Sequence, residues 1–237
     1  GVAALIIVMS VMNGFRAELF DKVVGLNGHA IIQGYDGRLN NWEQIADAAR
    51  KTPGVESAKP LIEQPLMASA NGRVEGVLVR GNTVEDIRTN AILNNKVVSG
   101  DLKSITPGSG RIAIGSRLAQ TLGAYPGSEI SLISPDGRST PVGTVPRIVT
   151  YTVGAIFEVG IFQYDEAFVI MPMQDAQTLL LLGNGVGMVE VQVEDPDRVS
   201  ETLAPLQPLV HGRGIIVDWK QMNSALFEAL EVERIAM

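Results

Sequence analysis

The chain has 237 residues, a formal net charge of −7 and no cysteine, and 46% of its residues are hydrophobic. This length allows one large domain or two smaller ones, and the apolar fraction is high enough for a folded core, which excludes a disordered chain. The acidic balance, without a Lys/Arg-rich stretch, argues against nucleic acid as a partner. The lack of cysteine excludes disulfides and thiolate metal sites.

The N-terminal segment 1–12 is uncharged and apolar on every side. At about 1.5 Å per residue it reaches roughly 18 Å, less than the ~30 Å hydrocarbon core of a bilayer. Three interpretations are open: the core of a signal peptide, a buried helix of a soluble domain, and the end of a transmembrane helix. The segment that follows favours the third, because Phe15, Leu19, Val23 and Leu26 recur at helical spacing between charged residues, as in a helix that leaves a membrane.

Between residues 28 and 220 the pattern alternates between strands and helices. Strands are expected at 29–33, 55–67, 74–80, 97–99, 111–114, 129–133, 151–157, 167–171, 189–193 and 214–219. Helices are expected at 40–52, 116–122, 173–182 and 197–206. The Asn71-Gly72 pair is the strongest hairpin signal of the chain. This order predicts an α+β fold with a second, β-rich module inserted near the centre.

The C-terminal segment 221–237 is expected to be helical. Small apolar residues recur on one of its faces, which allows close approach of another helix, as is common in and near membranes. The alternative is an ordinary helix packed on a core. Together with the N-terminal segment, the pattern favours a second helix that leads into a membrane.

Residues suited to catalysis are scarce. Neither His29 nor His211 has another ligand at metal-binding spacing, no serine stands in a G-x-S-x-G motif, and the glycines at 183–187 lack the Lys-Ser/Thr of a phosphate loop. Asp165 and Glu166 could act as a catalytic acid/base pair only if the fold holds their two carboxyl groups at a suitable distance from each other. The sequence therefore predicts no catalytic residue, no metal and no cofactor.

The segment 134–148 is unusual. It connects two predicted strands, and a connection of about fifteen residues is costly unless it is used, because hairpins usually turn in two to five residues. Its three prolines lower the entropy cost of an extended shape. Val142 and Val145 add apolar side chains to a loop expected to be polar. The pattern predicts a stiff arm that binds a partner by strand addition, and the alternative is a variable loop in which prolines resist proteolysis.

Three motifs, in order along the chain, have counterparts in one known family. They are SVMNGF with the amphipathic helix after it (10–26), T-P-x-G-x-x-P (140–146) and W-x-x-x-N-x-x-L-F-x-A-L-x-x-E (219–233). Together they resemble the LolC/LolE family, membrane subunits of the ABC transporter that releases lipoproteins from the inner membrane of Gram-negative bacteria. The first and last motifs fall where that family's first two transmembrane helices meet its periplasmic domain.

The resemblance implies a fold of the MacB-like superfamily. Its parts would be the end of a transmembrane helix (1–27), a Porter-like module (28–75 and 160–220), a Sabre-like module (76–159) and a helix that leads into the second transmembrane helix (221–237). The resemblance also implies that this chain is not an enzyme. ATP would be hydrolysed by a separate, cytoplasmic LolD-type subunit.

The resemblance also gives the arm a role. In LolC the arm is called the Hook, and it engages the periplasmic chaperone LolA. The Hook-like arm here is 134–147, and the expected chaperone-binding residues are Pro135, Thr140, Pro141, Val142, Gly143, Val145 and Pro146. The basic and amide residues that flank the Hook in LolC are replaced by Ser131, Ile148 and Val149, and the region 41–81 is closer to LolE. This mixture fits a hybrid, LolF-type subunit that works as a homodimer.

The expected partners are a LolA-type chaperone, lipoproteins, the LolD-type ATPase, a LolC/LolE-type subunit or a second copy, and the membrane. The expected location is the inner membrane of a Gram-negative bacterium, with this domain in the periplasm. The same superfamily offers two alternatives, a MacB-like efflux subunit and an FtsX-like regulator of cell-wall hydrolases. A membrane-anchored hydrolase is a third alternative. A pull-down from envelope extract would separate lipoprotein release, efflux and hydrolase regulation, because the captured partner would be a chaperone, an outer-membrane adaptor or a cell-wall hydrolase respectively.

Overall fold

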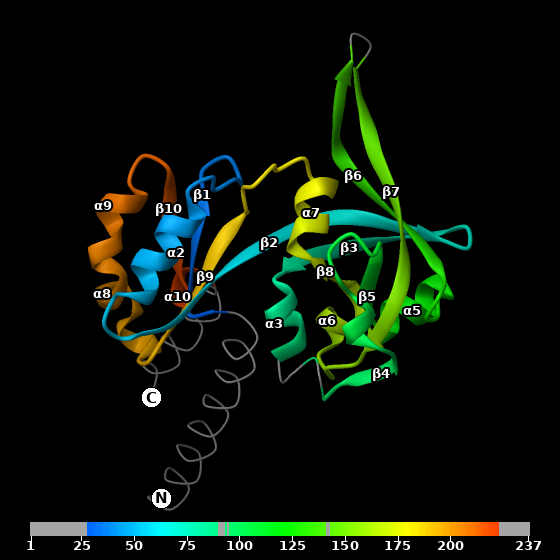
Figure 1. Ribbon diagram of the computed structural model, residues 1–237, viewed down its shortest axis with the longest axis horizontal. Coiled ribbons are helices and arrows are strands. Elements are labelled where there is room, and N and C mark those ends of the chain that lie inside the picture. The colour runs from blue at the N-terminus through cyan, green and yellow to red at the C-terminus, as the bar shows by residue number, and fades with distance from the viewer. Residues whose placement is uncertain (1–27, 90–92, 94, 141–142, 223–237) are drawn as a thin grey trace, which may run out of the picture. The chain divides into compact units, whose positions relative to one another are not determined.

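The computed structural model describes residues 28–222 except 90–92, 94 and 141–142 (Figure 1). The two helices expected to be directed at a membrane, 1–27 and 223–237, therefore lie outside the described residues. Among the helices that are described, none has the length and apolar character needed to cross a membrane.

The chain divides into two compact units. Within the described residues, the first comprises 28–35, 43–59 and 189–222, and the second comprises 36–42 and 60–188. The division into a Porter-like and a Sabre-like module, with boundaries at 75/76 and 159/160, is a different kind of division and stays a prediction.

The first unit is built on a small sheet. Its strand order is β10-β1-β9-β2, formed by Gly214–Asp218, Ala30–Gly34, Met188–Val193 and the first part of Val55–Ala70. β1 and β10 are antiparallel, with Ala30 opposite Asp218. Alternate residues of β1 and β9 are buried, as expected for strands with one face on a core. The helices of this unit are α2 (Trp42–Arg50), η2 (Pro196–Arg198), α8 (Val199–Leu203), η3 (Ala204–Leu206), α9 (Gln207–Val210) and α10 (Trp219–Met222).

The helix predicted at 197–206 is not continuous. It is divided into the short segments η2, α8 and η3, and α9 follows directly. Pro205 and Pro208 lie in the first turn of η3 and α9 respectively, where a missing N–H does least harm. The strand predicted at 214–219 ends one residue early. Trp219 begins α10, and the Asp218 carboxylate accepts the N–H of Gln221 at 2.8 Å as a helix cap.

The second unit contains the larger set of strands. The order is β2-β3-β8-β5-β7-β4, and β6 pairs with both β2 and β7. Besides β2, the strands are β3 (Arg73–Asn82), β4 (Val97–Gly100), β5 (Arg111–Gly115), β6 (Glu129–Thr140), β7 (Gly143–Phe157) and β8 (Phe168–Pro172). The helices are α3 (Val84–Thr89), η1 (Leu102–Ser104), α5 (Ser116–Leu122), α6 (Phe162–Ala167) and α7 (Met173–Leu179). The sequence did not predict α3 or α6, because six residues are too few to establish a helical period.

The β2–β3 hairpin confirms the prediction made from Asn71-Gly72. Both residues have positive φ, 50° and 73°, as the two central residues of a type I′ turn require. The Asn71 side-chain amide donates to the carbonyls of Leu122 and Gly123, both at 2.9 Å. Gly123 ends α5 in the left-handed conformation, with φ 63°. The turn and the helix end therefore stabilise each other.

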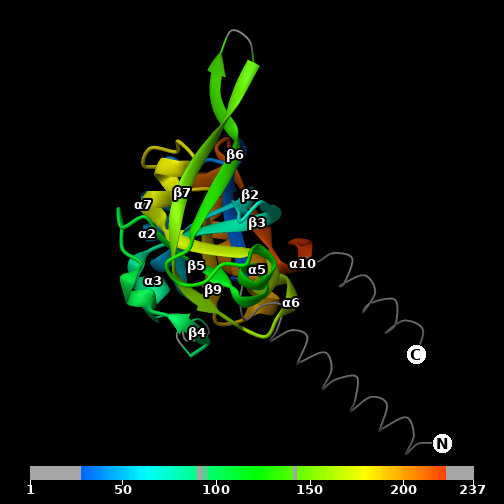
Figure 2. The same ribbon diagram turned by 90° about the vertical axis from the view of Figure 1, so that its right-hand side faces the viewer.

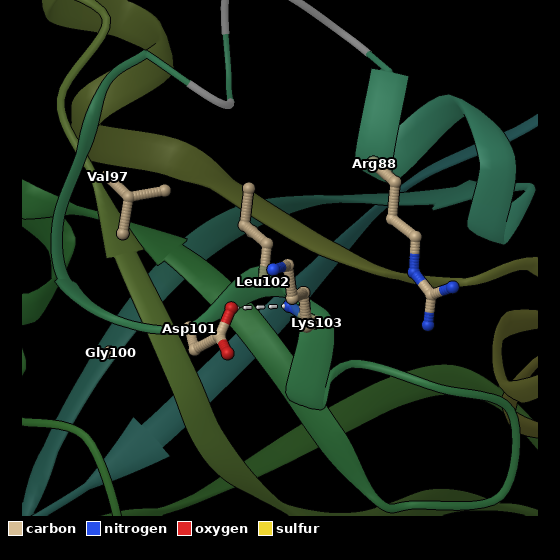
Figure 3. A pocket seen from close by; sticks show the side chains of 6 residues that line it. All are labelled: Arg88, Val97, Gly100, Asp101, Leu102 and Lys103. Atoms are coloured by element: carbon tan, nitrogen blue, oxygen red, sulfur yellow. Dashed lines mark hydrogen bonds between the residues drawn. The ribbon is translucent and has the colours of Figure 1, made fainter.

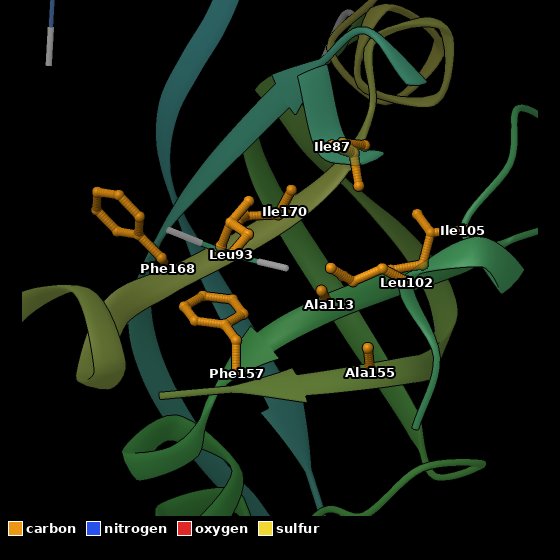
Figure 4. Close-up of a cluster of buried hydrophobic side chains, with 9 residues drawn as sticks. All are labelled: Ile87, Leu93, Leu102, Ile105, Ala113, Ala155, Phe157, Phe168 and Ile170. Atoms are coloured by element: carbon orange, nitrogen blue, oxygen red, sulfur yellow. The ribbon is translucent and has the colours of Figure 1, made fainter. Parts of the chain in front are cut away.

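A buried cluster fills one side of the second unit (Figure 4). It consists of Ile87, Leu93, Leu102, Ile105, Ala113, Ala155, Phe157, Phe168 and Ile170. Strand β3 is close to α7, because a Cβ placed on Gly81 would lie 2.5 Å from the Ala176 Cβ and 3.2 Å from the Ile62 Cβ. This packing holds β3, β8 and α7 together and supports the strands beside them.

Candidate functional site: a projecting hairpin

Strands β6 and β7 form one long antiparallel hairpin. The predicted strand ends at 133 and 151 are wrong, because Ser134 lies opposite Arg147, Arg138 opposite Val145, and Thr140 opposite Gly143. Prolines within the segment indicated a loop, but proline is tolerated on edge strands and at bulges. Pro135 and Pro146 lie at a shift of register between Ser134 and Arg138, which is such a place.

The distal part of the hairpin stands apart from the rest of the unit. β6 pairs with β2 only from Ser131 to Ile133, and the pairing of β7 with β5 begins at Thr152. Among the described residues, 134–140 and 143–149 pair only with each other. In two perpendicular views this part extends beyond the other strands of the second unit (Figures 1 and 2). The hairpin is therefore an arm.

The base of the arm is anchored on its inner face. Ile130, Leu132 and Ser134 of β6 are fully buried, and Tyr151 of β7 is 7% exposed. Burial, together with the nearby Asp175 carboxylate, raises the pKa of Tyr151 to about 12. The phenol is therefore neutral at physiological pH. The arm emerges from a well-packed base.

The outer face of the base carries a row of apolar side chains across three strands. Met67 of β2 lies opposite Ile133 of β6, and Ile133 lies opposite Ile148 of β7. Residues directly opposite in an antiparallel sheet share a face. Met67 is 49% exposed and Ile148 is 62% exposed. In the next row the Ser131 and Thr150 hydroxyls lie 3.0 Å apart in a hydrogen bond.

The residues predicted to bind a chaperone lie along this arm. Thr140 and Gly143 are the last opposite pair of the strands, and Pro141 and Val142 lie outside the described residues. Pro135 and Pro146 are exposed at the register shift, and Val145 is 55% exposed.

Val145 and Ile148 are three positions apart on β7, and the extra residues at the shift belong to β6. Their side chains therefore point to opposite faces of the hairpin. The sequence pattern of 134–148 did not indicate that Met67 and Ile133 would belong to the surface of the arm. Only strand pairing could place them beside Ile148.

Two of the residues considered for catalysis, Asp165 and His29, have structural roles away from the arm. The buried Asp165 carboxylate accepts the N–H groups of Val159 and Gly160 at 2.8 and 2.9 Å, which fixes the turn before α6. His29 Nδ1 accepts the Val193 N–H at 3.0 Å, and burial lowers the pKa of this ring. Within the described part of the chain, no group of three or more His, Cys, Asp or Glu could hold a metal ion.

A hollow of about 330 Å³ lies beside β4 and η1 (Figure 3). Its lining residues are Arg88, Val97, Gly100, Asp101, Leu102 and Lys103. The Asp101 carboxylate accepts the backbone N–H of Lys103 at 2.8 Å and so caps the 3₁₀ helix. The lining contains no His, Ser, Thr or Cys, and its carboxylate is engaged in the helix cap.

Sequence comparisons relate the chain to lipoprotein-release proteins. The LolC of Neisseria meningitidis serogroup B, a "lipoprotein-releasing system transmembrane protein", is 31% identical over the whole chain. The LolC of Xylella fastidiosa strain Temecula1 is 28% identical, also over the whole chain. The chain spans 57% of the length of each of these relatives. The resemblance to the LolC/LolE family predicted from the three motifs is thereby confirmed.

Comparisons with solved structures concern the fold alone. The periplasmic region of MacB from Actinobacillus actinomycetemcomitans has a TM-score of 0.54 at 12% identity, over 87% of this chain and 95% of that one. The extracellular domain of the Gram-positive transporter YknZ has a TM-score of 0.52 at 14% identity, over 79% and 96%. These similarities confirm the predicted α+β, MacB-like architecture. The family of MacB-like periplasmic core domains matches residues 1–209, and the chain therefore belongs to that family.

Proposed function

We propose that this chain is the periplasmic domain of an inner-membrane ABC transporter subunit that passes lipoproteins to a LolA-type chaperone. The observation that carries the proposal is the β6–β7 arm, which has exposed apolar side chains on two opposite faces, Val145 on one and Ile148 on the other. The names of the LolC relatives support lipoprotein release as the activity of the whole protein.

The two-faced arm suits insertion into a cavity better than docking on a flat surface. A flat partner would cover only one face and leave the other in water. A partner that surrounds the arm would remove both Val145 and Ile148 from water, and apolar burial contributes about 25 cal/mol per Å². A chaperone that carries acyl chains must itself offer an apolar cavity, so the arm and such a chaperone are complementary in chemistry.

The other predicted arm residues have roles that follow from the backbone. Pro135 and Pro146 would stiffen the arm at its register shift and thereby lower the entropy lost on binding. Thr140 and Gly143 would close the paired strands at the far end of the arm, and Pro141 and Val142, which lie outside the described residues, stay predicted contacts of the chaperone. In this arrangement Val145 and Ile148 supply the apolar contact below the far end.

The remaining partners belong to the same proposal. A LolD-type subunit would hydrolyse ATP, and this chain, without catalysis of its own, would move as a rigid body when the membrane helices move. A LolC/LolE-type subunit or a second copy would complete the transporter in the membrane. A MacB-like efflux subunit is the second candidate function, because the chain belongs to the family of MacB-like periplasmic core domains.

Reconstitution tests this function. The full-length subunit would be placed in liposomes with its ATPase and a labelled lipoprotein, and transfer to a soluble LolA-type chaperone would be measured with and without ATP. We expect transfer that requires both ATP and chaperone, and a Val145→Glu variant that hydrolyses ATP but transfers poorly. The matched control is Val98→Glu on β4, because Val98 is exposed to a similar extent, 60% against 55%. ATP hydrolysis without any transfer, or transfer that Val145→Glu leaves unchanged, would contradict the proposal.

A further inference from the structure

Three polar atoms at the base of the arm are buried without a hydrogen-bond partner. They are Ser134 Oγ on β6, Arg147 Nε on β7 and Asp175 Oδ2 on α7. Ser134 is completely buried and lies opposite Arg147 in the hairpin. Leaving one buried polar atom unpaired costs about 1–3 kcal/mol, so three in one place are unusual in a native fold.

The charges of Arg147 and Asp175 both act on Tyr151 of β7. The Asp175 charge raises the pKa of Tyr151, and the Arg147 charge acts on it in the opposite direction. The other oxygen of Asp175 accepts the Gly108 N–H at 2.9 Å, which holds the carboxylate at the inner side of the arm. Among the described residues, neither Arg147 nor Asp175 has an ion-pair partner. Two opposite charges therefore lie in one region without being paired.

The backbone at the same place is a natural joint. From Ser134 opposite Arg147 to Arg138 opposite Val145, β6 advances four residues while β7 advances two. Such a bulge bends the strand and interrupts the ladder. Beyond it, within the described residues, the arm has no lateral strand that would resist a change of angle. Nearer the body, β2 and β5 hold both strands.

We propose that the base of the arm is a joint with two positions, and that the second position pairs the Arg147 guanidinium with the Asp175 carboxylate. In the present position neither charged group has an ion-pair partner among the described residues, and Ser134 Oγ has no hydrogen-bond partner. A change of angle at the bulge that brings β7 toward α7 forms the ion pair and satisfies two of the three atoms. Because this gain is offset by the bending of the hairpin, the two positions differ little in free energy and both are populated.

A distance measurement in the whole chain tests the joint. The sequence has no cysteine, so Val145→Cys on the arm and Tyr125→Cys on the body can be spin-labelled without other changes. Both sites lie in the second unit and both are exposed. Pulsed electron–electron double resonance then gives the distribution of distances between the two spin labels. No chaperone is needed, so the outcome is independent of the proposed function.

We expect two distances with the native residues in place. Asp175→Asn and Arg147→Met should each reduce the second population about tenfold, and the double variant should go no further because both changes remove one interaction. Glu75→Gln, at a partly exposed carboxylate of β3, is the matched control and should leave the distribution unchanged. If either single variant fails to fold, the charge swap Arg147→Asp with Asp175→Arg should fold and restore two distances. One distance in the native background, or a distribution that neither the single variants nor the swap alters as stated, would overturn the joint.

Discussion

The replacement of Val145 by Glu is the most direct probe of the arm. Val145 is 55% exposed, so about half of its side chain is still available for burial in a partner. Complete burial of a valine contributes about 1.5–3 kcal/mol, so the contact is worth about 1 kcal/mol. The Glu variant loses this contact and also places an unpaired charge in an apolar site, which weakens the binding free energy further. We expect a total loss of at least about 2 kcal/mol, or about 30-fold in Kd.

A graded series makes the measurement specific. Val145→Ala removes about two methylene equivalents, of which a partner could bury about half. The binding free energy should therefore weaken by about 0.8 kcal/mol, or about fourfold in Kd. Isothermal titration calorimetry of each purified variant with a LolA-type chaperone gives the Kd of Val145→Glu and of Val145→Ala. Val98→Glu on β4 is the control for a general effect of added charge, since Val98 is 60% exposed and lies away from the arm. Its Kd should equal that of the unchanged chain.

Stability separates binding from folding in this experiment. An exposed side chain on an arm contributes little to the core, so Val145→Glu should change the free energy of unfolding by less than about 0.5 kcal/mol. Urea denaturation of each variant checks this. Equal affinity of Val145→Glu and the unchanged chain, with both folded, would refute the arm as the docking element. A large loss of stability would show instead that Val145 supports the fold.

Three further predictions concern the body of the chain. Asp165→Ala should lower the free energy of unfolding by about 3 kcal/mol, because two backbone N–H donors lose a charged acceptor. Glu166→Ala, at the exposed neighbour, should change it by under about 0.5 kcal/mol. Similar urea midpoints for the two variants would refute the role of Asp165. Burial lowers the pKa of His29 from 6.5, so stability should be full above pH 6.5 and fall below it, where the unfolded state takes up the proton first. His29→Asn should reduce this slope between about pH 7.5 and about pH 5, and an unchanged slope would assign it to other groups. Gly81→Ala should lower Tm and reduce the free energy of unfolding by about 2 kcal/mol, because the added methyl group overpacks the contact with α7. Gly76→Ala on the same strand should leave Tm unchanged, because no atom lies within 4 Å of its added Cβ. Equal Tm values for the two variants would contradict the close packing at Gly81.

The sequence by itself determined the local elements whose signals are short-range. The helix at Ser116–Leu122 and its end at Gly123 follow from apolar spacing and from one glycine that can adopt a left-handed conformation. The turn at Asn71-Gly72 follows from two adjacent residues that tolerate positive φ. These features depend on neighbours along the chain, so they could be predicted without a partner strand. The three motifs likewise identified the family before any fold was known.

Only the tertiary structure decided how the arm is built and what surrounds it. The prolines of 134–148 indicate a loop locally, yet pairing between β6 and β7 extends both strands because the bulge accommodates Pro135 and Pro146. The row from Met67 to Ile148 joins residues far apart in the sequence, and strand register is set by the whole sheet. The same holds for Asp165, which the sequence allowed as part of an acid/base pair and which the fold uses to hold a turn. Long-range pairing is decided by the burial of entire faces, and no single stretch of sequence contains that information.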